Sequence, residues 1–527
     1  MWPEPGPSLV TPSSRNLNVF LLLRRAPNRV ARGWAPGNAP TEASRIQYKW
    51  TVLTVTTVGV LMAGIDSRIV IVGLPQVAAS LRADAEQAIW ITQAYVLGST
   101  VALLLIGRIS DIVGRVKLYT SGFAVFTVGS LLTSLAVDPA QVIAFRAIQG
   151  LGSAILFTNS AAMIVDATPS QELGLSLGIN QIAFRMGSMA GLTISGIILS
   201  FLDWRALFYV NVPIGIFGTA WAHFRLREIG KLERGAPIDW GGFSAFTVFI
   251  MSLLLGLTLA AYGVAEMRTV IVLLAVSFLS LGAFVVLEHR HPHPLLDLKL
   301  LRIREFTGGV VAQLLNAIAF GAVLLLLSLY FQLVLKQSPL TTGLLMIPLD
   351  IATLAAGPLS GRLSDKYGHL PFTTSGLTVI SLSLYLFSTT DASTPYSHLV
   401  VYMLLFGAGL GFFASPNISS IMGSVPPERR GIASGFRATF FNVGYTISLN
   451  LAILITTFTV PYALVTQIIS SGNTAGISDA ERMLFAEGIK TTYLWLAGIN
   501  TLAILPSLLR GRRPNRMAPA SVASVDP

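Results

Sequence analysis

The sequence predicts an all-α polytopic membrane protein. Of its 527 residues, 53% are hydrophobic and only 12% are charged, whereas soluble domains carry roughly one-quarter charged residues. Long apolar runs recur along the chain, each near the ~20 residues that a helix needs to cross ~30 Å of hydrocarbon. The alternating segments of about ten residues that build a membrane β-barrel do not recur, so helical spans are expected.

The apolar runs define fourteen expected transmembrane helices in three groups. The first six cover 50–72, 88–108, 118–136, 140–164, 173–200 and 205–224. Two follow at 239–260 and 269–288, and the last six cover 305–333, 340–361, 370–388, 398–422, 430–456 and 490–510. An even number of spans places both termini on one side of the membrane.

The basic residues predict which side that is. Most of the 36 Lys and Arg residues lie in the two tails and in the loops on the same side, and the loops on the other side hold only Arg82, Arg205, Arg268, Lys336, Arg482 and Lys490. Cytoplasmic loops carry such an excess, so both termini are expected in the cytoplasm and the protein in the inner or plasma membrane of the cell, among its lipids. These loops account for the net charge of +11, and nucleic acid is not an expected partner.

An internal repeat predicts two related halves. "GRISDIVGR" at 107–115 and "GRLSDKYGH" at 361–369 share five residues in register, each after the second span of a six-span block. The expected divisions are a first half at 49–230, two linker spans with a cytoplasmic loop at 231–304, a second half at 305–512, and cytoplasmic tails at 1–48 and 513–527. The first tail is expected to be disordered, or to be sequence upstream of the true start. Paired halves with a site at their interface are typical of secondary transporters.

With these motifs the chain resembles the major facilitator superfamily, specifically its fourteen-span drug/proton antiporter family of the multidrug efflux type, from Lys49 to Arg513. The first copy of the repeat matches the family's signature loop at Gly107, Asp111, Gly114 and Arg115, and the second matches at Gly361, Asp365 and Gly368. The resemblance implies the major-facilitator fold and a gating role for both loops on the cytoplasmic side. Gly107 is expected to allow close helix packing and Gly114 a tight turn.

Two further matches imply a site for protons. Asp66 lies in "GIDSRIVIVGLP" and Arg146 in "RAIQGLG", and the resemblance implies that Asp66 carries a coupling proton whose affinity Arg146 tunes. Span 5 departs from the family, because "FRMGSMAGLTISGIIL" has Leu192 where the antiporter motif has a proline. An uncoupled or differently coupled lipid or metabolite transporter of the same fold is therefore an alternative, and a non-transporting membrane receptor or scaffold is an alternative of another class.

Few charges fall inside the expected spans. They are the acids Asp66 and Asp350 and the arginines Arg68, Arg146, Arg185 and Arg437. Each costs ~2.5 to 3.5 kcal/mol at the centre of a membrane helix, so a functional role is the default expectation. Either acid could bind and release a proton; the alternative is an acid that is permanently protonated or paired with Arg and only locks helices together.

The substrate site is expected between the halves. Asp350, in "LLMIPLDIATLAAG", aligns with Val96 of the first half and is a candidate ligand for a proton or a substrate. Arg185 and Arg437 occupy similar places in the two halves and are expected to face one cavity, unless Arg437 reaches the cytoplasmic side. Arg68 is expected to extend to the outer membrane surface. The excess of positive charge favours anionic, zwitterionic or neutral amphipathic substrates.

Aromatic residues could line such a site or pack against other helices and lipid. The candidates are Phe157, Phe184, Phe413, Phe440 and Phe441.

No enzyme, metal or cofactor chemistry is predicted. The chain has no cysteine, the loop "EHRHPHP" lacks the spacing that would bring three histidine rings to one metal ion, and the nucleophile and phosphate-binding motifs of enzymes are missing. Energy must then come from an ion gradient or from the gradient of the substrate. The sequence predicts a monomeric, proton-coupled secondary transporter that exports small amphipathic organic compounds by alternating access.

Overall fold

The computed structural model describes residues 42–510 except 170–171, 230–236, 263–265, 293, 297, 426–429, 462–463 and 465–477. The predicted tail at 513–527 and most of the tail at 1–48 lie outside these residues. Every regular element within them is helical, which confirms the predicted all-α class.

The described residues of the first half form seven helices, of which α6 and α7 together form the sixth predicted span. They are α1 (Glu42–Leu81), α2 (Ala85–Val113), α3 (Arg115–Leu135), α4 (Pro139–Ala167), α5 (Leu173–Phe201), α6 (Ala206–Tyr209) and α7 (Asn211–Arg225). Two long helices follow, α8 (Trp240–Tyr262) and α9 (Met267–Arg290), and then the short η2 (Leu298–Arg302).

The second half repeats this pattern with more breaks in its helices. It contains α10 (Arg304–Phe320), α11 (Val323–Leu329), η3 (Tyr330–Val334), α12 (Pro339–Leu345), α13 (Ile347–Tyr367), α14 (His369–Phe387), α15 (Tyr396–Gly423), α16 (Arg430–Thr457), α18 (Asp479–Leu502) and α19 (Ile504–Leu508). Helix α18 begins before the predicted start at 490, because the side chains of Ser478 and Glu481 form a capping box there.

Eleven helices within the described residues are long and apolar enough to cross a membrane. Helices α2, α7 and α18 fall outside that group, yet each packs along a helix that belongs to it: α2 on α4, α7 on α3 and α18 on α14. The described helices are therefore consistent with the predicted fourteen spans.

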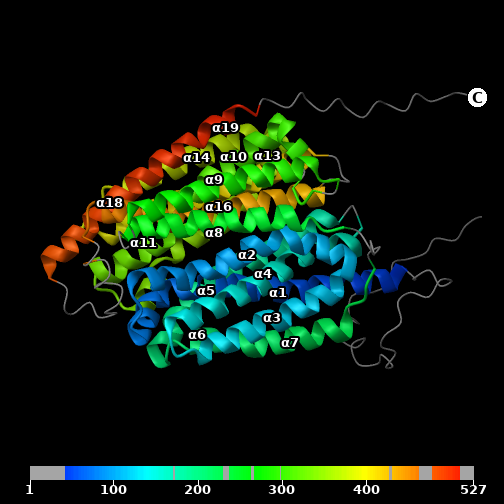
Figure 1. Cartoon of the computed structure of the whole chain (residues 1–527), viewed down its shortest axis with the longest axis horizontal. Helices are drawn as coiled ribbons and strands as arrows, with labels where there is room; N and C mark the ends of the chain where they lie inside the picture. Colours follow the sequence, from blue (N-terminus) through cyan, green and yellow to red (C-terminus); the bar gives the residue numbers. More distant parts are fainter. Residues whose placement is uncertain are drawn as a thin grey trace, which may run out of the picture. The chain divides into compact units, whose positions relative to one another are not determined.

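The helices pack mainly within their own half. In the first half α1 packs on α5 and α4 packs on α2 and α3, and in the second half α15 packs on α13 and α14 while α10 packs on α16. The two linker helices pack on each other, and α8 also contacts α16 and α2 (Figure 1). Helix α8 thus covers the seam where one half meets the other.

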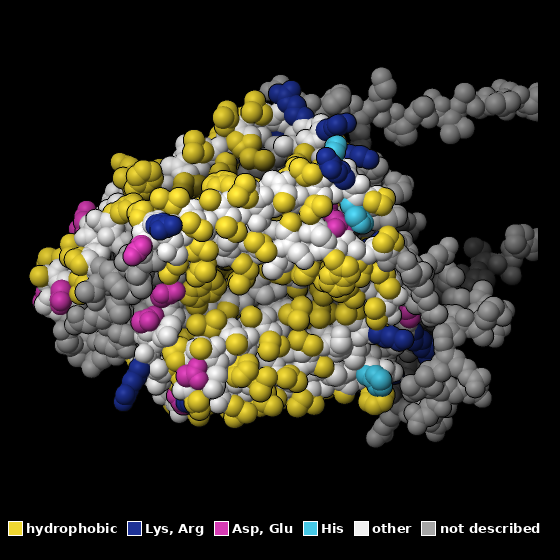
Figure 2. All heavy atoms as spheres, viewed as in Figure 1, with side chains coloured by type: hydrophobic (Ala, Val, Ile, Leu, Met, Phe, Trp, Pro, Cys, Tyr) yellow, Lys and Arg dark blue, Asp and Glu magenta, His cyan; other side chains and the backbone are white. Residues whose placement is uncertain are grey.

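The surface has the pattern of a membrane protein. In Figure 2 the acidic and basic side chains gather at the two ends of the visible face, and hydrophobic side chains are spread over the band between them. On α9, Phe278 and Leu279 are 69% and 74% exposed, which water would oppose and lipid would favour.

Equivalent glycines end α2 and α13 at the two signature loops. Gly114 has φ +112° and Gly368 has φ +87°, a region that favours glycine, so both halves need glycine at the same turn. Arg115 pairs with Asp166 of α4 at 2.6 Å, while the side chains of Asp111 and Asp365 lie outside the described part. Among the described residues, no heavy atom outside the local helix lies within 4 Å of a Cβ built on Gly107, so close packing at Gly107 stays a prediction.

The two halves meet at the end of the bundle opposite the start of α1, which we call the distal end. A Cβ on Gly196 of α5 would lie 2.6 Å from the Cα of Leu340 in α12, and a Cβ on Gly343 would lie 2.7 Å from the carbonyl oxygen of Leu192. Nearby, the Gln332 amide donates to the Val72 carbonyl at 3.2 Å. Leu192 is 1% exposed and lies inside α5, which continues without the break that a proline would favour.

Candidate functional site

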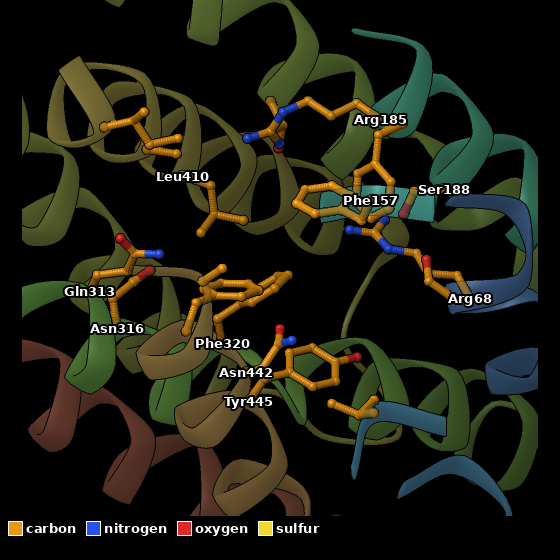
Figure 3. A pocket seen from close by; sticks show the side chains of 18 of the residues that line it. Arg68, Phe157, Arg185, Ser188, Gln313, Asn316, Phe320, Leu410, Asn442 and Tyr445 are labelled. Carbon is orange, nitrogen blue, oxygen red and sulfur yellow. The ribbon is translucent and has the colours of Figure 1, made fainter. Parts of the chain in front are cut away.

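A cavity of about 300 Å³ lies between the two halves. Helices α1, α2, α4 and α5 of the first half and α10, α13, α15 and α16 of the second supply its walls. Figure 3 shows Arg68, Phe157, Arg185 and Ser188 on one side of this space and Gln313, Asn316, Phe320 and Leu410 on the other. The volume is at the lower end of the range of sites for small organic molecules.

Aromatic side chains form much of the apolar wall. Phe157, Phe184, Phe413 and Phe441 line the cavity as expected, and Phe157 meets Phe184 edge to face at 5.7 Å. Phe440 does not line it: its ring stacks on Phe436 with the centroids 4.7 Å apart and packs against a core cluster beside α8. One residue along a helix turns the side chain by roughly 100°, so Phe441 faces the cavity and Phe440 faces away.

Four amide side chains contribute to the polar part of the wall. They are Gln313, Asn316, Asn417 and Asn442. Sequence reasoning did not select these amides as site residues. The one feature that could have indicated them is that they interrupt otherwise apolar runs.

Asp350 forms an ion pair across the cavity. The Arg68 Nη1 atom donates to Oδ1 of Asp350 at 2.7 Å, and the two side chains are 15% and 11% exposed. Arg68 belongs to α1 and Asp350 to the first turn of α13, so the pair connects the two halves. The prediction that Arg68 reaches the membrane surface is wrong, because α1 continues to Leu81 rather than ending at 72 and carries Arg68 well inside the bundle.

Arg185 and Arg437 face the same cavity, one from each half. Within the described part of the chain neither guanidinium has a carboxylate at ion-pair distance, and the buried Nε of Arg437 has no hydrogen-bond partner. The Arg185 side chain is exposed, and it lines the cavity (Figure 3).

Asp66 lies behind the cavity wall in a polar cluster and is 0% exposed. Its carboxylate accepts from Arg146 at 2.6 Å, from the Gln149 amide at 2.7 Å and from the Asn211 amide at 2.9 Å. The Arg146 guanidinium also lies 4.4 Å from the ring centroid of Tyr95, and Tyr95 lines the cavity. Sequence reasoning assigned roles to Asp66 and Arg146 but gave none to Gln149, which lies in the matched segment "RAIQGLG", or to Asn211.

A bundle of two helical halves around a central cavity is the architecture of a membrane transporter of the major-facilitator class. The chain belongs to the Major Facilitator Superfamily, whose sequence model matches residues 56–449. Its similarity to multidrug resistance proteins supports membership of the drug/proton antiporter family.

Among curated proteins, the riboflavin transporter RibZ of Clostridioides difficile is 30% identical over 403 residues, which cover 76% of this chain and 87% of RibZ. Multidrug resistance protein Stp of Mycobacterium tuberculosis is 29% identical, with 75% of this chain and 73% of Stp covered. Multidrug resistance protein 3 of Bacillus subtilis is 25% identical, with 78% and 80% covered.

Two solved structures share the fold. A bacterial homologue of the human lysosomal transporter Spinster, in an inward-facing and unoccupied conformation, has a TM-score of 0.62 at 13% identity and covers 88% of this chain and 97% of its own. A D-xylose-proton symporter has a TM-score of 0.60 at 15% identity and covers 87% and 97%. These likenesses show the fold, which agrees with the predicted major-facilitator bundle.

Proposed function

We propose that the protein is a proton-coupled secondary transporter that exports small amphipathic organic compounds by alternating access. The observation that carries this proposal is the Arg68–Asp350 ion pair, which joins the two halves inside their shared cavity. The contacts at the distal end, between Gly196 and Leu340 and between Gly343 and Leu192, fit a state closed on that side. The names of the multidrug resistance relatives support export.

Asp350 is the proposed proton site that the cavity reaches directly. A neutral carboxyl group no longer attracts a guanidinium as a carboxylate does, so protonation would release Arg68 and remove one link between the halves. Loss of the proton would restore that link. Asp66 with Arg146 is a second proposed proton site, and Tyr95 would have to move before water from the cavity reached it.

We also propose roles for the signature loops, an oligomeric state and an orientation in the membrane. The signature loops at 107–115 and 361–369 would act as latches between conformations, aided by the contact of Arg115 with Asp166. We propose that the protein works as a monomer in the cell membrane with both termini in the cytoplasm, in accord with its basic loops.

Transport by the purified full chain in proteoliposomes tests the function. The probes are naphthalene sulfonate, naphthalene sulfonamide and naphthyl trimethylammonium, because the anion and the cation keep their charge across a pH gradient. Proton exchange predicts that a transported probe accumulates in an acidic lumen. Accumulation on the basic side would instead indicate symport, equilibration without accumulation would indicate an uncoupled transporter, and no movement of any probe would favour a receptor or scaffold.

Replacing Asp350 with asparagine is expected to reduce proton-driven accumulation to the level of protein-free liposomes. The amide cannot bind and release a proton, whereas the cavity keeps its shape, so binding of the same probe to the purified variant should remain measurable. Asp203→Asn is the matched control, because Asp203 is exposed and lies outside the cavity. Unchanged accumulation in the Asp350 variant would remove this residue from the coupling mechanism.

A further inference from the structure

We propose that the substrate is an amphipathic organic anion, with a sulfonate or carboxylate head bound by Arg185 and Arg437 and an aromatic body against the phenylalanines of the cavity. The proposal rests on the proposed transport function, to which it adds the class of substrate. The arrangement of charge, the free donors and the shape of the wall each support it.

The charged groups that line the cavity favour an anion. Among the residues that the structure describes, they are three guanidinium groups, on Arg68, Arg185 and Arg437, and one carboxylate, on Asp350. That carboxylate is already held by Arg68 at 2.7 Å, so a cationic substrate would have to break the pair before it found a partner. It would also face the other two guanidinium groups, and like charges at short range inside a protein repel strongly.

The free donors also favour an anion. Removing a guanidinium from water is costly unless a counter-charge or hydrogen bonds replace the lost hydration. Within the described residues no carboxylate lies at ion-pair distance from Arg185 or Arg437, and the buried Nε of Arg437 has no hydrogen-bond partner. The planar fork of an arginine matches the oxygens of a carboxylate or sulfonate, and the amide of Asn442, close to Arg437 on α16, could donate to the same head group.

The walls fit an aromatic body. Phe157 and Phe184 stand beside Arg185 in the first half, and Phe413 and Phe441 belong to the second half with Arg437. Aromatic faces hold planar ligands of various shapes, while the charged head fixes orientation. Arg185 of the first half and Arg437 of the second both lack an ion-pair partner within the described residues. An anion bound between them would therefore attract both halves at once.

Binding of the three naphthalene probes to the purified full chain, measured by calorimetry in detergent, tests the proposal. We expect the sulfonate to bind at least ~10-fold more tightly than the sulfonamide, since one charge-assisted pair contributes about that much, and the trimethylammonium probe to bind most weakly. Arg185→Gln and Arg437→Gln should each remove most of this preference. Arg185→Lys and Arg437→Lys, which keep the charge, should retain a large part of it and also show that a substitution at each site is tolerated.

Arg268→Gln is the matched control, because it also removes an arginine but at an exposed position at the start of α9; it should leave all three affinities unchanged. Equal binding of sulfonate and sulfonamide, binding of none of the probes, or a preference that survives both glutamine variants would overturn the proposal. Proton-driven transport of the sulfonamide or the cation without any preference for the sulfonate would overturn the substrate class and leave the transport function standing. Tight sulfonate binding without transport of any probe would leave the preference for an anion standing and overturn the transport function.

Discussion

Replacing Asp66 with leucine is expected to destabilise the protein by ~3 to 5 kcal/mol, because removing one partner of a buried ion pair leaves the other charge uncompensated. Arg146 would keep its place at 1% exposure and lose its carboxylate at 2.6 Å. The amides of Gln149 and Asn211 would lose their acceptor as well. The measurement is thermal unfolding of the purified variant in detergent, followed by tryptophan fluorescence.

Two comparisons make this prediction specific. Asp203→Leu removes an acid from an exposed pair with Arg205, and such pairs contribute about 0 to 1 kcal/mol. Equal unfolding temperatures for the Asp66 and Asp203 variants would contradict the prediction. Asp66→Asn keeps the size of the side chain and two polar atoms, so a folded Asp66→Asn protein that binds the probe but fails to accumulate it would assign the coupling proton to Asp66.

Replacing Gly196 with leucine is expected to open the distal end of the bundle and to reduce transport. The new side chain would begin 2.6 Å from the Cα of Leu340, and backbone at that distance cannot move aside without separating α5 from α12. Overpacking of this kind costs about 1 to 3 kcal/mol, which shifts an equilibrium between two conformations by roughly tenfold or more. The conformation open at the distal end should therefore become the more populated one.

The lack of native cysteine allows a direct measurement. A single reporter, Ser67→Cys on the cavity wall, is labelled in intact cells with a maleimide that does not cross membranes. In the Gly196→Leu background the labelling rate should rise roughly tenfold. Gly282→Leu is the matched control, because no heavy atom of the described neighbouring residues lies within 4 Å of a Cβ at Gly282. A labelling rate that is the same in both backgrounds would show that the α5–α12 contact does not close the cavity.

Sequence reasoning worked best where the signal was local. Hydropathy placed the helices, and the repeated loops placed Gly114 and Gly368 at the same turn in both halves, where each has positive φ. It also selected the small set of charged residues that line the cavity or lie behind its wall. Helix ends were less certain, since nothing between 72 and Leu81 signalled that α1 continues, and that error moved Arg68 to the wrong depth.

Neighbouring residues on one helix show a second limit. Phe440 and Phe441 are identical in type, and only the rotation of α16 directs one towards a core cluster and the other towards the cavity. Asn211 shows a third, because its role depends on the distant Asp66, which its amide reaches at 2.9 Å. Neither the directions of these two phenylalanines nor the contact of Asn211 with Asp66 can be inferred from composition or residue spacing.

Residue types and their local pattern are enough to specify a helical membrane bundle of two related halves with a few charges inside it. Those properties follow from the transfer of each side chain between water and hydrocarbon, which depends on residue type and near neighbours. The pairing of Arg68 with Asp350, in contrast, became visible only in the folded bundle, where it leaves Arg185 and Arg437 facing open cavity. Pairing depends on the depth and rotation of helices that lie far apart in the chain. Within the described part of the chain it leaves these two guanidinium groups without an ion-pair partner, which is the basis of the proposed anion site.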